Sequence, residues 1–120
     1  MSKKFNIQIS EIVGSDLCIA SDEGQKVYEE IATALRKELK VELSFLNVTT
    51  LTSAFLNAAI GQLYSGEFPA DKIKKSLSVS NIDQDDLALL KRVVETAKEY
   101  FKDPKRFEAA RKEVLGDDDE

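Results

Sequence analysis

Four short segments of the chain have the hydrophobic pattern of β-strands. In the first, Phe5, Ile7 and Ile9 alternate with polar residues, a period of two that is typical of a half-buried strand. Turn residues separate the first segment from the second, and we expect these two segments to form a β-hairpin. The predicted strands are residues 5–10, 17–20, 41–46 and 77–81.

Between the strands, apolar residues recur at helical spacing. Val27, Ile31 and Leu35 are four residues apart, and Asp83 precedes the longest amphipathic stripe, where it is expected to cap a helix. A short turn or helix should follow Pro69. The predicted helices are residues 21–39, 51–64, 83–101 and 104–116.

This order of elements predicts an α/β fold: a four-stranded mixed β-sheet with helices mainly on one face, plus an extra C-terminal helix. We expect residues 1–103 to form one domain, residues 104–116 to pack on it as a helix, and residues 117–120 to be an acidic, disordered tail. The residues expected to be largely buried are Leu43, Phe45, Ile60, Leu90 and Val94.

Composition narrows the classes of function. The 120 residues include no histidine, which excludes His-based triads and His metal sites. Five scattered glycines form no phosphate-binding loop. The net charge of −5 includes four tail acids, so the body is nearly neutral and has no basic face for nucleic acid. No apolar run is long enough for a membrane span. We therefore expect a cytoplasmic protein that is not an enzyme and uses no metal or cofactor.

Two other features have simple structural explanations. Cys18 lies among apolar residues of a predicted strand, which favours a buried and unreactive thiol. Asp83, Asp85 and Asp86 cluster where a helix is predicted to begin. Carboxylates stabilise a helix N-terminus, so capping explains this cluster better than a cation site does.

The junction between the third strand and the following helix is rich in hydroxyl groups. It contains more hydroxyls than one helix cap requires, and it precedes a helix N-terminus with unpaired N–H groups. A phosphate on Ser53 or Thr52 would be tolerated there while changing the surface charge. Capping and partner binding both remain explanations of this pattern. The candidate partner-binding residues are Asn47, Thr49, Thr50, Thr52, Ser53 and Asn57.

The stretch VELSFLNVTTLTSAFLNAAIGQLY, residues 41–64, resembles a STAS-like family of bacterial domains of unknown function. These are distant relatives of the sulfate-transporter and anti-sigma-factor-antagonist (STAS) domain. In STAS antagonists, a Ser/Thr at the start of the second helix is phosphorylated by a partner kinase, which breaks their complex. Ser53 matches that position and Thr52 is the second choice. The antagonists usually have Asp before and Gly after the serine, where this chain has Thr52 and Ala54.

The resemblance implies a regulatory protein-interaction module whose partner is an ATP-binding protein of the histidine-kinase-like type. Nucleotide chemistry would then belong to the partner. The alternative is a small structural or homo-oligomeric subunit, such as a homodimer, without a phosphorylation switch. A purely structural or partner-contacting role for Ser53 also stays open.

Overall fold

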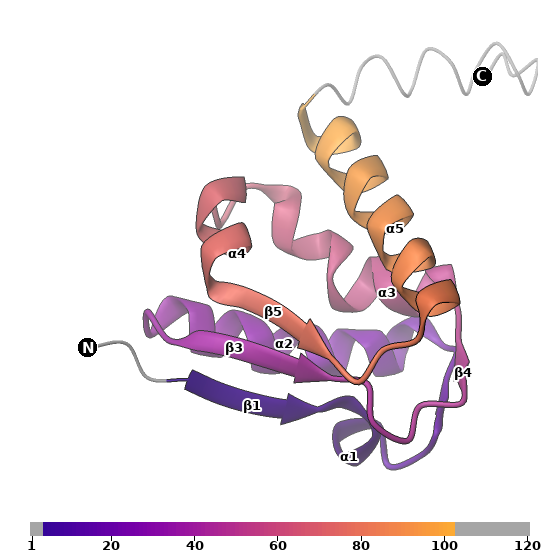
Figure 1. Ribbon diagram of the computed structural model, residues 1–120. Helices are drawn as coiled ribbons and strands as arrows, with labels where there is room; N and C mark the ends of the chain where they lie inside the picture. The colour runs from indigo at the N-terminus through magenta and orange to yellow at the C-terminus, as the bar shows by residue number, and fades with distance from the viewer. Residues whose placement is uncertain (1–3, 103–120) are drawn as a thin grey trace, which may run out of the picture.

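The computed structural model describes residues 4–102 and shows an α/β fold (Figure 1). The predicted C-terminal helix 104–116 and the tail 117–120 lie outside the described residues. The elements, in chain order, are β1 (Lys4–Gln8), α1 (Ile9–Val13), β2 (Leu17–Cys18), α2 (Ser21–Arg36), β3 (Lys40–Ser44), β4 (Thr50–Leu51), α3 (Ser53–Ala59), the 3₁₀ helix η1 (Gly61–Ser65), α4 (Ala70–Ser76), β5 (Leu77–Ser80) and α5 (Gln84–Lys102).

The main sheet has three parallel strands in the order β1-β3-β5. Leu43 of the central strand lies between Ile7 of β1 and Val79 of β5 in the register. Parallel strands need long crossover connections, and here helices supply them. One crossover contains α2, and the other contains α3, η1 and α4.

The two faces of the main sheet differ in polarity. Val41, Leu43 and Phe45 are buried, whereas Glu42 and Ser44, which alternate with them, are partly exposed. The apolar face is covered by α2, which lies behind the sheet in Figure 1. On the polar face, Lys4 Nζ lies 2.7 Å from Glu42 Oε1, and this contact lowers the pKa of Glu42.

The expectation of one four-stranded mixed sheet is wrong. The segment expected to be the second strand is reduced to β2, which pairs in parallel with β4 in a separate two-stranded sheet. The expected hairpin is wrong as well, because residues 9–13 form α1 rather than the end of a strand. Ile9, Ile12 and Val13 have helical spacing, and Gly14 ends the helix with a φ of 78°, in the left-handed region that suits glycine.

Most residues expected in the core are there. Leu43, Phe45, Ile60 and Leu90 are buried, while Val94 is only partly buried. The helix expected over 51–64 is divided at Ile60 into α3 and η1. The helix expected over 21–39 ends at Arg36, and Glu38 follows with a φ of 63°.

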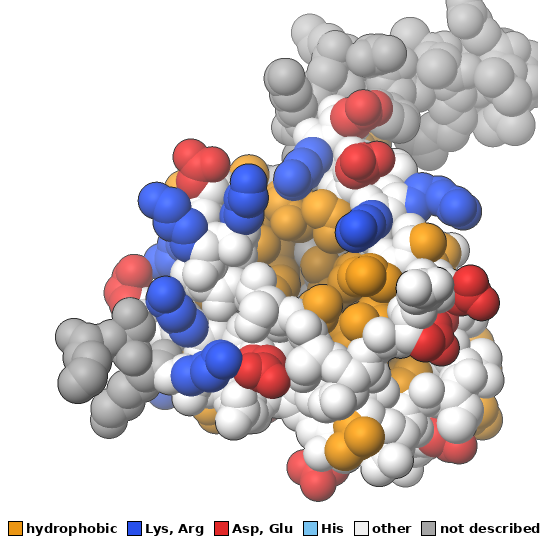
Figure 2. All heavy atoms as spheres, in the orientation of Figure 1, with side chains coloured by type: hydrophobic (Ala, Val, Ile, Leu, Met, Phe, Trp, Pro, Cys, Tyr) orange, Lys and Arg blue, Asp and Glu red, His pale blue; other side chains and the backbone are white. Residues whose placement is uncertain are grey.

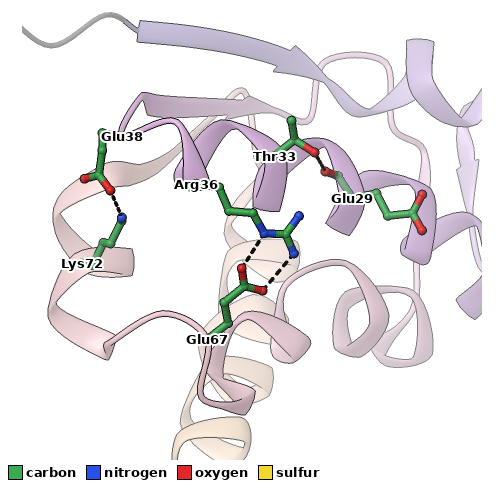
Figure 3. A network of polar contacts seen from close by, with 6 residues as sticks. All are labelled: Glu29, Thr33, Arg36, Glu38, Glu67 and Lys72. Carbon is green, nitrogen blue, oxygen red and sulfur yellow. Dashed lines mark hydrogen bonds and ion pairs between the residues drawn. The ribbon is translucent and has the colours of Figure 1, made fainter.

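Polar contacts join the C-terminal end of α2 to the segment that contains η1 and α4 (Figure 3). Arg36 makes a two-pronged contact with Glu67, in which Nη2 lies 2.9 Å from Oε1. This contact raises the pKa of Arg36 and lowers that of Glu67. Lys72 Nζ donates to Glu38 Oε2 at 2.6 Å. These exposed pairs orient the elements but add little stability.

Candidate functional site

Asn47 belongs to the turn that follows β3. The Val48 N–H donates to the Phe45 carbonyl at 3.0 Å and closes this turn. Asn47 has a φ of 68°, in the left-handed region that asparagine adopts more readily than most residues. Its side chain is exposed. The backbone conformation alone therefore explains an asparagine at this position.

Thr49 ties the segment before β4 to the segment before β2. Its N–H donates to the Asp16 carbonyl at 2.9 Å, and its hydroxyl oxygen lies 3.1 Å from Asp16 Oδ2. The N–H of Thr50 also points to the Asp16 carbonyl, at 3.4 Å. These contacts bring together two segments that are far apart in the sequence.

Thr52 is the N-cap of α3, and its hydroxyl is fully engaged. Its Oγ1 accepts a hydrogen bond from the Phe55 N–H at 3.2 Å and donates one to the Ile19 carbonyl at 2.6 Å. Its N–H donates to the Cys18 carbonyl at 3.2 Å. Modification of this hydroxyl would remove the cap and detach α3 from the segment after β2.

Ser53 has a different environment from its neighbour Thr52. It is the first residue of α3, its side chain is exposed, and its hydroxyl makes no hydrogen bond to another residue of the described range 4–102. Asn57 is also exposed and lies four residues further, on the same face of the helix. Ser53 is thus, like the exposed Thr50, a hydroxyl at this junction that can change chemically without breaking a contact among the described residues.

The structure adds two apolar residues that the sequence analysis did not select. Leu17 and Ile19 remain 46% and 45% exposed. Leu17 is paired with Thr50 in the register, while Cys18, which separates the two apolar residues, is buried. Because all three residues are apolar, the sequence pattern alone does not indicate which of them face outward. We call the residues Leu17, Ile19, Thr50, Ser53 and Asn57 the junction surface.

Cys18 lies beneath this surface and is fully buried, as expected. Burial, followed by the nearby Glu23 and Asp16 carboxylates, raises the pKa of its thiol to about 11. A thiol with this pKa carries almost no thiolate at neutral pH. Cys18 is therefore a core side chain rather than a nucleophile.

The acidic cluster at the start of α5 caps that helix. Asp83 Oδ1 accepts a hydrogen bond from the Asp86 N–H at 2.8 Å. Burial, and then the charges of Asp83 and Asp85, raise the pKa of Asp86. Within residues 4–102 no group of three or more potential acidic or thiol ligands is arranged to hold a metal ion. Over the same range, no helix combines the length and apolar character that crossing a membrane requires.

Comparison with known proteins gives one match. No curated protein and no solved structure matches the chain. The model of a family described as "STAS-like domain of unknown function (DUF4325)" matches residues 23–87, from the first turn of α2 to the first turn of α5. This match covers more than half of the chain and includes β4 and the start of α3. The chain therefore belongs to this STAS-like family.

Proposed function

We propose that this protein is a non-catalytic regulatory module that binds an ATP-binding, histidine-kinase-like protein through the junction surface and is switched by phosphorylation of Ser53. The observation that carries this proposal is the exposure of Leu17 and Ile19 on the segment that Thr52 contacts, together with the exposed Ser53, whose hydroxyl has no partner among the described residues. The class of partner comes from the resemblance to STAS antagonists.

The apolar part of the junction surface supports binding to a protein. A single exposed leucine is ordinary on a protein surface, but Leu17 of β2 and Ile19, just after β2, are two large apolar side chains exposed two residues apart. Protein interfaces commonly have an apolar centre with a polar rim. Here Thr50, Ser53 and Asn57 would provide part of such a rim.

The polar part of the surface supports a switch at Ser53. A phosphoryl group adds roughly −1.5 to −2 charges at neutral pH. On Ser53 it would project from the exposed side of α3 and leave the cap made by Thr52 intact. The fold would survive while the interface changed, which is what a reversible regulator requires. On Thr52, the same group would disrupt the cap.

The proposed contact of Leu17 with the partner is tested with the variant Leu17→Ser. Phe5→Ser is the matched control. Phe5 is also partly exposed, at 40%, but it lies near the start of β1, on the side of the molecule away from β4 (Figure 1). Calorimetry with a candidate ATP-binding, histidine-kinase-like protein should show about tenfold weaker binding for Leu17→Ser only. Equal affinities for both variants would exclude Leu17 from the interface.

The switch is tested by incubating the chain with that partner and ATP, followed by intact-mass and peptide mass measurements. One phosphoryl group should appear on Ser53, and Ser53→Ala should prevent it. Transfer to Thr52, or no transfer at all, would contradict the assignment of Ser53. A concentration-dependent mass of the chain alone would instead favour the homo-oligomeric alternative.

A further inference from the structure

An apolar groove lies beside β5 and shares no residue with the junction surface. Its volume is about 240 Å³, and it is bounded by β5, α4, η1 and α5. Its walls include Leu77 and Val79 of β5, Ile73 of α4, and Leu90 and Val94 of α5. Figure 2 shows hydrophobic side chains gathered in this hollow, with several Lys and Arg side chains, and some Asp and Glu side chains, above it.

One wall of the groove is a strand edge that no other strand of residues 4–102 pairs with. β5 is the outermost strand of the order β1-β3-β5. The Phe45 N–H donates to the Ser80 carbonyl at 3.0 Å, so the main-chain groups of Ser80 point toward β3. Main-chain groups of successive residues in a strand point to opposite sides. The N–H and carbonyl of Val79 therefore point away from β3, toward the groove.

Lysine side chains lie in and beside the groove. Lys74 is the charged residue in its lining, and Lys98 Nζ lies 5.8 Å from the ring centre of Tyr64, another lining residue. Lys91 and Lys98 are three and four residues from Val94, so they flank it on the same face of α5. Pairing of β5 with β5 of a second copy would bring these lysines together, whereas an acidic segment would neutralise them.

We infer that the groove and the edge of β5 bind an extended, acidic segment of a protein partner. The segment adds a strand beside β5 and pairs with the main chain of Val79. Alternate apolar side chains of the segment enter the groove, and its carboxylates contact Lys74 and Lys98. This binding mode is independent of the junction surface, so the domain can engage two segments at once.

The probe for this inference is a short, fluorescently labelled peptide in which valine alternates with glutamate. The matched control peptide has lysine in place of glutamate. Fluorescence anisotropy with the full chain should show binding of the glutamate peptide at least about tenfold tighter than binding of the lysine peptide. Equal binding of both peptides, or no binding of the glutamate peptide, would overturn the inference.

Two kinds of variant test the geometry. Val79→Pro removes an N–H that points away from β3, so the ladder to β3 stays intact and peptide binding should be lost. The double variant Lys74→Glu/Lys98→Glu keeps the strand and should bind about tenfold more weakly. Lys26→Glu, at an exposed position of α2, is the charge control and should bind normally. Normal binding by the double variant, or by a folded Val79→Pro chain, would contradict the inference.

Other occupants give different results. A full-length variant with a neutral C-terminal end carries the substitutions Asp117→Asn, Asp118→Asn, Asp119→Asn and Glu120→Gln. Peptide binding that appears only in this variant would assign the groove to the chain's own C-terminal end. Dimerisation that Val79→Pro abolishes would assign it to a second copy. Ser53→Asp should bind the peptide like the unmodified chain, so this inference and the proposed function fail separately.

Discussion

Gly24 lies where α2 packs closely against α3, and replacing it with alanine should destabilise the fold. Gly24 is buried in α2. A Cβ at this position would lie 2.4 Å from the Phe55 carbonyl oxygen and 2.9 Å from Ala58 Cβ. The nearest atom is main chain of α3 and not the mobile end of a side chain. The added methyl group therefore has to push the two helices apart.

The size of the effect follows from two opposing contributions. Alanine in a helix interior is favoured over glycine by about 0.5–1 kcal/mol. Overpacking a well-packed core costs about 1–3 kcal/mol, and a contact as short as that with the Phe55 carbonyl belongs at the upper end of this range. The net loss for Gly24→Ala should be about 2 kcal/mol. For a domain of this size, such a loss lowers the melting temperature by roughly 10 °C.

Gly61→Ala is the matched control for this prediction. A Cβ on Gly61 would lie 3.3 Å from Asn57 Oδ1, a side-chain atom that can move, and 3.8 Å from Ala97 Cβ. Its stability should therefore change by no more than about 0.5 kcal/mol. Thermal and urea denaturation followed by circular dichroism compares the two variants. A Gly24→Ala chain as stable as the Gly61→Ala chain would refute the reasoning about the α2–α3 contact.

Three further predictions concern stability. Thr52→Ala should lower the free energy of unfolding by about 1 kcal/mol in urea denaturation because it removes the cap of α3, whereas Ser53→Ala should change it by less than about 0.5 kcal/mol. Folding raises the pKa of Cys18 to about 11, so the thiol ionises at lower pH in the unfolded chain than in the folded one. The free energy of unfolding should therefore fall as the pH rises from about 9 to 11, and Cys18→Ala should reduce this fall. Deleting residues 117–120 should leave the melting temperature nearly unchanged at ordinary salt, because four adjacent acids bury no apolar surface.

Features that depend on neighbouring residues could be predicted from the sequence. The strand 77–81 matches β5 to within a residue, because its apolar pattern lies just before a clear helix start. The capping role of Asp83 follows from its place before an amphipathic stripe, and its hydrogen bond to the Asp86 N–H confirms it. Such signals are local in the chain, so one sequence is enough to find them.

Features that depend on distant residues could not be predicted in this way. The pairing of β2 with β4 relies on Asp16 and Thr49, which are 33 residues apart and whose contact leaves no periodic signal. Leu17 and Ile19 were expected within a strand of the main sheet. Of Leu17, Cys18 and Ile19, only Cys18 of β2 faces the core, and its two neighbours remain at the surface.

The junction surface is the central claim of this account. Its most direct test is the affinity of the ATPase-type partner for the unmodified chain, Ser53→Ala and Ser53→Asp, measured by calorimetry together with the melting temperature of each chain. The account predicts that Ser53→Asp keeps its melting temperature and binds at least about tenfold more weakly, while Ser53→Ala still binds. Folded chains with the same affinity for all three forms would contradict it.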